Sequence, residues 1–198
     1  MADLTISRNH LQSVMLAAAT DANRYNLCGV YFDTDGGKLR LVATNGHILA
    51  TILTDTEVPE GFTPFRLDGD DGSLSRLDKA SRGKDGETIE LHRIDSGHYS
   101  ATVNGMGLEL GTEEGGTCFP NWRQVVPGDT APVDGPIGFD AAYLGRIAAI
   151  VAKFYGRTKN HNAPSQWTFA GNLAPAICRA TDDNADAELM AVIVSMRL

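Results

Sequence analysis

Short runs of alternating apolar and polar residues, closed by turns, dominate the sequence. Residues 27–33, 38–44 and 47–54 alternate in this way, with turns at 35–37 and 45–46 between them. Period-two patterning buries one face of a strand, and Asp-Gly or Asn-Gly turns reverse the chain. These residues therefore predict three consecutive antiparallel strands.

A short strand and a helix are predicted ahead of these three strands. Residues 4–6 form the strand, and Ser7 is placed to cap the helix. The i, i+3, i+4, i+7 spacing of a helix face is met by Leu11, Val14, Met15 and Ala18. The first unit therefore has the order βαβββ.

The same order recurs in a second stretch of the chain. Residues 65–67 predict a short strand, Asp70 or Asp71 a helix cap, and Leu74 and Leu77 an apolar helix stripe. Three further strands are predicted at 88–94, 98–103 and 106–112.

A third stretch repeats the order once more. A short strand is predicted at 137–139, with Asp140 as the helix cap. The clearest amphipathic helix of the chain has an apolar face made of Leu144, Ile147, Ala148, Val151 and Phe154. Three strands follow at 166–170, 174–180 and 188–197.

The sequence thus predicts an α+β fold of three βαβββ repeats that start about 60 to 75 residues apart, with helices on one face of antiparallel sheets. Residues 117–127 carry two prolines and a tryptophan, which favours an anchored segment. Residues 128–136 are rich in Pro, Gly and Asp, as is typical of a linker.

Composition narrows the class of protein. With 42% hydrophobic and 21% charged residues, the 198-residue chain is typical of a folded globular protein. No apolar stretch reaches the roughly 20 residues of a membrane span, and no secretion signal is recognised. The isolated Cys28, Cys118 and Cys178 favour a reducing cytoplasmic compartment. A net charge of -8 disfavours indiscriminate coating of nucleic acid.

The basic residues gather on the predicted helices despite this acidic balance. Arg146, Lys153 and Arg157 fall within an arc of roughly 40° on the third helix. The other candidates are Arg8, Arg24, Arg76, Lys79, Arg82 and Lys84. Solvated helix faces commonly carry such residues, but their recurrence in the repeats favours a shared surface facing DNA phosphates.

No catalytic or cofactor site is predicted. No Ser, Cys or carboxylate is spaced from His47 in a way that marks a nucleophile or an acid/base pair. We therefore expect a protein that is not an enzyme. The sequence 33–36 faintly resembles a calcium loop, but its position between strands favours a hairpin. His92 and His98 lack further metal ligands, and we expect neither metal nor cofactor.

Four segments carry a family resemblance. Residues 24–30, 41–47, 119–127 and 196–198 resemble, in the same order, the bacterial DNA polymerase III β subunit, the DNA sliding clamp. The resemblance implies that residues 1–127 form a complete clamp domain of two halves, about 1–58 and 59–127. It implies that residues 128–198 form a single half-domain like the end of the last clamp domain.

The resemblance also implies a function and partners. Sliding clamps encircle duplex DNA without reading its sequence and tether a replicative DNA polymerase and other partners, and a clamp loader places them on DNA. The resemblance implies that a pocket for partner peptides is made of Leu27, Thr44, His47, Leu49, Pro120, Val125, Val192, Val194, Met196, Arg197 and Leu198.

The family pattern is not followed at every pocket position. Asn45, Ile48, Gln124 and Ser195 depart from it, so the preference for partners could differ. Family rings contain twelve half-domains, so three per chain would require a homo-oligomer of four chains. Two alternatives remain open. One is an adaptor, or a competitor for clamp-binding motifs, that keeps the pocket but forms no ring; the other is an enzyme or small-molecule binder that reuses the fold.

Overall fold

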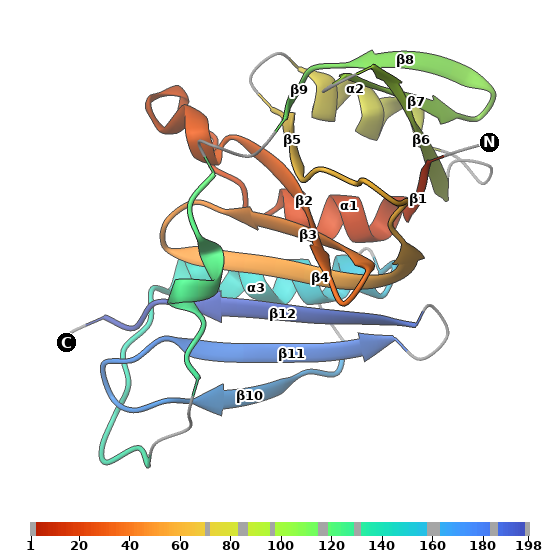
Figure 1. Cartoon of the computed structure of the whole chain (residues 1–198). Helices are drawn as coiled ribbons and strands as arrows, with labels where there is room; N and C mark the ends of the chain where they lie inside the picture. The colour runs from red at the N-terminus through yellow and green to blue at the C-terminus, as the bar shows by residue number, and fades with distance from the viewer. Residues whose placement is uncertain are drawn as a thin grey trace.

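The computed structural model contains two antiparallel sheets and three α-helices, which confirms the predicted α+β fold (Figure 1). It describes residues 3–69, 72–82, 87–95, 98–114, 119–128, 132–157, 163–182 and 186–196. None of the helices described is long and apolar enough to cross a membrane.

Each of the three predicted repeats forms one unit of the structure. Unit one contains β1 (Leu4–Ser7), α1 (Arg8–Met15), the 3-10 helix η1 (Ala22–Leu27), β2 (Gly29–Asp35), β3 (Lys38–Thr44) and β4 (Ile48–Glu57). Unit two contains β5 (Phe65–Asp68), α2 (Ser73–Ala80), β6 (Thr88–Asp95), β7 (His98–Val103), β8 (Met106–Leu110) and β9 (Thr112–Glu114).

Unit three follows a 3-10 helix, η3 (Trp122–Val125), and contains α3 (Ala141–Phe154), β10 (Gln166–Phe169), β11 (Ala176–Asp182) and β12 (Ala187–Ile193). Two of the three predicted helix caps are confirmed. The Ser7 side chain accepts from the Asn9 amide and that of Asp140 from the Ala142 amide. Asp70 and Asp71 lie outside the described residues, and Gly72, with a φ of 80°, occupies the N-cap of α2.

Units one and two exchange their first strands. The four-stranded sheet has the order β1-β6-β7-β8, so the first strand of unit one lies in the sheet of unit two. The eight-stranded sheet has the order β10-β11-β12-β4-β3-β2-β5-β9, so β5 of unit two pairs with β2 of unit one. Pairing of β12 with β4 joins unit three to unit one in a continuous sheet.

The helices form one layer, with α1 between α2 and α3 (Figure 1). The Gln12 amide of α1 donates to the Asp78 carboxylate of α2. On the other side of α1, the buried Ser13 hydroxyl donates to the Ile150 carbonyl of α3 over 2.8 Å. Polar contacts therefore connect all three helices.

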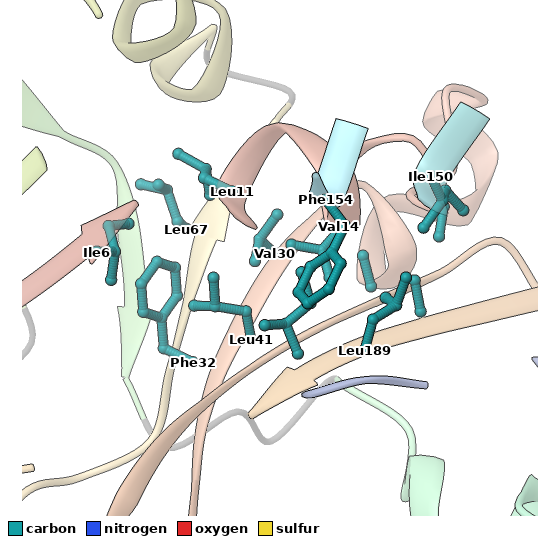
Figure 2. Packing of buried hydrophobic residues seen from close by; sticks show 14 of the residues in the cluster. Ile6, Leu11, Val14, Val30, Phe32, Leu41, Leu67, Ile150, Phe154 and Leu189 are labelled. Atoms are coloured by element: carbon teal, nitrogen blue, oxygen red, sulfur yellow. The ribbon is translucent and has the colours of Figure 1, made fainter. Parts of the chain in front are cut away.

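Apolar side chains from the sheets and the helix layer form the main core (Figure 2). Val14 of α1, Phe154 of α3 and Leu189 of β12 meet over the junction between units one and three. Each is almost fully buried. Burial of such side chains contributes roughly 1.5–3 kcal/mol each, so the junction is held by a shared core.

Three local predictions were wrong. The strand predicted from residue 27 begins at Gly29, and Leu27 is the last residue of the 3-10 helix η1. The strand predicted at 106–112 is broken at Gly111, and its last part becomes β9 in the other sheet. Residues 137–139 form only an isolated bridge, between Gly138 and Met196.

Candidate functional site

A cavity of about 310 Å³ opens on the face of the eight-stranded sheet opposite the helices. Strand pairing places Ile177, Val192, Leu49 and Thr44 in one row across β11, β12, β4 and β3. Because side chains alternate along a strand, this row points away from the helix layer. Three members of the row, Thr44, Leu49 and Val192, line the cavity.

Segments that lie far apart in the sequence meet around this cavity. Eight of the predicted pocket residues line it: Leu27, Thr44, His47, Leu49, Pro120, Val125, Val192 and Val194. Met196 is not among the lining residues; its amide donates to the Gly138 carbonyl over 2.8 Å instead. Arg197 and Leu198 lie outside the described residues.

Further residues line the cavity that sequence reasoning did not select. They are Asn26, Gly46, Asn121, Trp122 and Pro175; Ile48, which departs from the family pattern, also lines the cavity. Pro175 comes from the connection between β10 and β11, far from the segments that resemble the clamp family. No pattern in the sequence brings this loop to the cavity that Leu27 lines, because units one and three are joined only in the folded chain.

The turn between β3 and β4 is held by its own side chains. The Thr44 hydroxyl donates to the Ile48 carbonyl over 2.7 Å. The Asn45 carboxamide oxygen accepts from the amides of His47 and Ile48 over 2.9 and 3.0 Å. Gly46 has a φ of 87°, which glycine adopts without strain. His47 is therefore presented at the cavity by a turn of defined shape.

Asp33 anchors the segment that forms the other wall. Its carboxylate Oδ2 accepts from the Trp122 indole nitrogen over 3.0 Å and from the Arg123 guanidinium over 2.6 Å. Burial, reinforced by the Asp33 charge, raises the pKa of the neighbouring Tyr31. The Tyr31 ring stacks on Phe119, with the ring centres 4.8 Å apart. Trp122 and Phe119 thus fix the segment that carries Pro120 and Val125.

A second cavity, of about 290 Å³, lies on the other side of His47. The His47 ring stacks on Tyr143 of α3 with centres 5.1 Å apart. Arg24 and Arg146 also line this cavity, and the Arg24 guanidinium donates to the Asn45 carbonyl over 2.6 Å. Arg24 lies on η1, outside the layer of α-helices, and its predicted role in facing DNA stays a prediction.

A larger cavity, of about 440 Å³, lies beyond Trp122 and has a different character. Arg40, Arg123 and Arg179 line it together with Asp35 and Glu188. Charged groups surround this larger cavity, so it suits an apolar side chain poorly. The apolar cavity beside His47 is the better site for a Leu or Phe side chain.

The helix layer carries most of the other predicted basic residues. Its three helices contain five basic residues and one acidic residue, whereas the whole chain has a net charge of -8. Arg8 donates to the Ser81 carbonyl, and Arg82, just after α2, pairs with Asp78. Arg146 and Arg157 are exposed, and Lys84 lies outside the described residues.

Comparison with known proteins agrees with this architecture. Residues 5–61 match the family model for the central domain of the DNA polymerase III β subunit. A search of curated protein sequences finds no match.

Solved sliding clamps match nearly the whole chain. The β sliding clamp of Caulobacter crescentus is 20% identical, with a TM-score of 0.70 over 98% of this chain and 65% of its own. The Bartonella birtlesii clamp bound to griselimycin is 18% identical, with a TM-score of 0.74 over 100% and 66%. The Thermotoga maritima β subunit is 15% identical, with a TM-score of 0.72 over 100% and 66%.

The fold is that of the bacterial DNA sliding clamps. The chain therefore has a clamp-like fold, and it spans slightly less than two thirds of the Caulobacter clamp. The division into a complete domain and a half-domain stays a prediction.

Proposed function

We propose that the chain is a DNA sliding clamp and polymerase processivity factor, which holds a replicative polymerase or another partner near duplex DNA by binding a short peptide. The observation that carries this proposal is the apolar cavity between the β3–β4 turn, the 120–125 segment and the end of β12. The fold and the family match of residues 5–61 support the same function.

The cavity has the properties of a site for peptide side chains. Val125 and Val194 are 50% and 47% exposed on opposite walls, while Leu49 and Val192 are buried beneath them. Exposed apolar walls over a packed floor favour a Leu or Phe side chain, because its burial removes apolar surface from water on both partners. Few polar groups surround the cavity. They would orient the peptide, and most of the binding free energy would come from apolar burial.

The helix layer supplies the surface that would face DNA. Basic side chains on α1, α2 and α3 lie on elements that contact one another, so their charges act on the same region. Contacts of this kind reach phosphates and carry no information on base sequence. Binding through this layer would therefore be independent of DNA sequence, as processivity requires.

The peptide site is tested by placing a charge on each wall. Val125→Asp and Val194→Asp should each weaken binding of a short fluorescent peptide whose only apolar residues are a Leu and a Phe. We expect a loss of at least roughly tenfold, because a carboxylate beside the bound side chain would lose its water. Fluorescence anisotropy measures the affinity.

Ile94→Asp provides the matched control. Ile94 is 58% exposed on β6 in the other sheet, so the same substitution adds the same charge away from the cavity. The control should bind the peptide as the unchanged chain does. Equal affinities for the unchanged chain, the two cavity variants and the control would place the peptide elsewhere and reject the proposed site.

A clamp-like adaptor that forms no ring would share the peptide site but not retention on DNA. Retention on nicked circular DNA, with release after linearisation, distinguishes the two functions. Peptide binding without such retention would favour the adaptor.

A further inference from the structure

The exchange of first strands makes units one and two dependent on each other. Val30 of β2 pairs with Leu67 of β5, and Leu4 of β1 pairs with Leu91 of β6. In each case the first strand of one unit adds to the second strand of the other. Each first strand also lies beside the last strands of its own unit: β5 pairs with β9, and the Thr56 hydroxyl donates to the Thr5 carbonyl over 2.6 Å.

Unit three has both parts of this arrangement but, within the described residues, no second unit to complete it. Its first segment bridges its own last strand region, since Gly138 pairs with Met196. Its second strand, β10, ends the eight-stranded sheet, and none of the strands described pairs with its outer edge. β10 occupies the position that β2 and β6 hold in their units, where each accepts a first strand.

We propose that two copies of the chain join through unit three, with residues 137–139 of each copy pairing with β10 of the other. Both the donating segment and the accepting edge belong to the same unit, so the surface is self-complementary. A two-fold axis then makes both pairings at once, which is the usual geometry of a homodimer. An unrelated partner would have to supply both parts itself.

The free side of α3 fits a second α3. At roughly 100° per residue, Ala141, Gly145 and Ala149 lie on the side of the helix away from Ile150. Ile150 faces α1, where its carbonyl accepts from Ser13. In units one and two the corresponding helices touch each other, through Gln12 and Asp78. Small side chains on the free side of α3 would allow a second helix to approach closely.

Gly145 lies inside α3, and the contacts of a single chain give no reason for a glycine at this position. A Cβ atom added there would meet nothing within 4 Å. A glycine inside a helix costs about 1 kcal/mol relative to alanine. Among the residues that the structure describes, no packing within one copy offsets that cost, whereas a helix from the second copy would occupy the open space.

Exposed apolar side chains surround the same region. Phe169 at the end of β10 is 36% exposed and lies 6.5 Å from Phe139, measured between ring centres. Leu173 is 61% exposed in the turn that follows, where the Asn172 side chain accepts from the Asp134 amide. Pairing of two copies along β10 would cover apolar surface beside the new strand contacts, which supplies a driving force for association.

The mass in solution tests the pairing. Light scattering at micromolar concentration should give at least twice the 21.2 kDa of one chain. Gly145→Glu should reduce this mass at least twofold, because the added side chain fills the helix contact and opposes its copy across the axis. The variant should fold, since the space around Gly145 is open in one chain.

Two control variants accompany this measurement. Gly145→Ala keeps a small side chain and should keep the higher mass. Gly128→Glu adds the same charge where a Cβ also meets nothing within 4 Å, outside unit three, and should keep it as well. A wild-type mass of 21.2 kDa, or an unchanged mass for Gly145→Glu, would overturn the proposal.

Hydrogen exchange locates the contact. Amides of β10 should exchange more slowly in the wild type than in Gly145→Glu, while those of β7 should not change. Equal exchange of β10 in the two proteins would contradict the pairing. Gly145→Glu should bind the test peptide with unchanged affinity, so a failure of this pairing is distinguishable from a failure of the proposed peptide site.

Discussion

His10 shows how one titratable side chain can couple the helix layer to pH. It lies buried on α1, and its ring stacks on Phe154 of α3 with centres 5.4 Å apart. Burial lowers the pKa of His10, and the Asp182 charge opposes this only in part. Neutral imidazole is therefore the form that suits the contact between units one and three.

We expect the chain to lose stability as the pH falls below the ordinary histidine pKa of about 6.5. In that range the unfolded chain binds a proton that folded His10 resists, so the free energy of unfolding falls with pH. Urea unfolding of the wild type and of His10→Phe at a series of pH values measures the effect. The wild type should lose more stability than the variant over this range; parallel curves would show that His10 is not responsible.

The 119–127 segment shows how an element without regular strand pairing is held in place. Its 3-10 helix is short, and its position depends on Trp122 and Arg123 meeting the Asp33 carboxylate. The element is therefore positioned by one buried acid on β2. Its prolines and tryptophan indicated an anchored segment, but the anchor lies 89 residues away in the chain.

Asp33→Ala should detach this element. The buried indole N–H would lose its acceptor, which costs about 1–3 kcal/mol, and the wall carrying Pro120 and Val125 would move. We expect lower stability in urea and weaker peptide binding together. Asp55→Ala is the control, because its pair with Lys38 is exposed and such pairs contribute only about 0–1 kcal/mol. Equal losses in both variants would argue against a special role for Asp33.

At the scale of the whole molecule, the layers separate two kinds of surface. The helix layer concentrates basic residues on one face, and the opposite face of the eight-stranded sheet carries the apolar cavity. Under the proposed function, the basic surface would face DNA and the cavity would face a partner. The net charge of the chain is -8, so a basic helix layer contrasts with an acidic whole.

Reversal of charge on the helix layer should weaken binding to DNA. Lys153→Glu combined with Arg157→Glu should lower the affinity for a labelled duplex roughly tenfold and reduce the slope of log K against log salt by about 0.9 for each phosphate that is no longer neutralised. Lys38→Glu combined with Arg179→Glu makes the same change in charge on residues outside the helix layer, and should leave the slope unchanged. Identical slopes for both double variants would contradict a DNA-facing helix layer.

The sequence by itself determined the local elements. Period-two alternation and Gly-containing turns located the hairpins of β2, β3 and β4, because burial of one strand face leaves that pattern in the chain. Ser7 and Asp140 located helix starts for an equally local reason. Eight of the residues that the resemblance assigned to a peptide pocket line one cavity, and their role in binding a peptide stays a prediction.

Only the tertiary structure decided which strands exchange, that β9 joins a different sheet from β8, and that Pro175 and Leu27 line the same cavity. It also showed that the Arg24 side chain of η1 donates to the Asn45 carbonyl in the turn before His47. Hydrogen bonds between strands of different units form between backbone groups that every residue carries. Their partners therefore leave little trace in the sequence, and the packing of the units selects them.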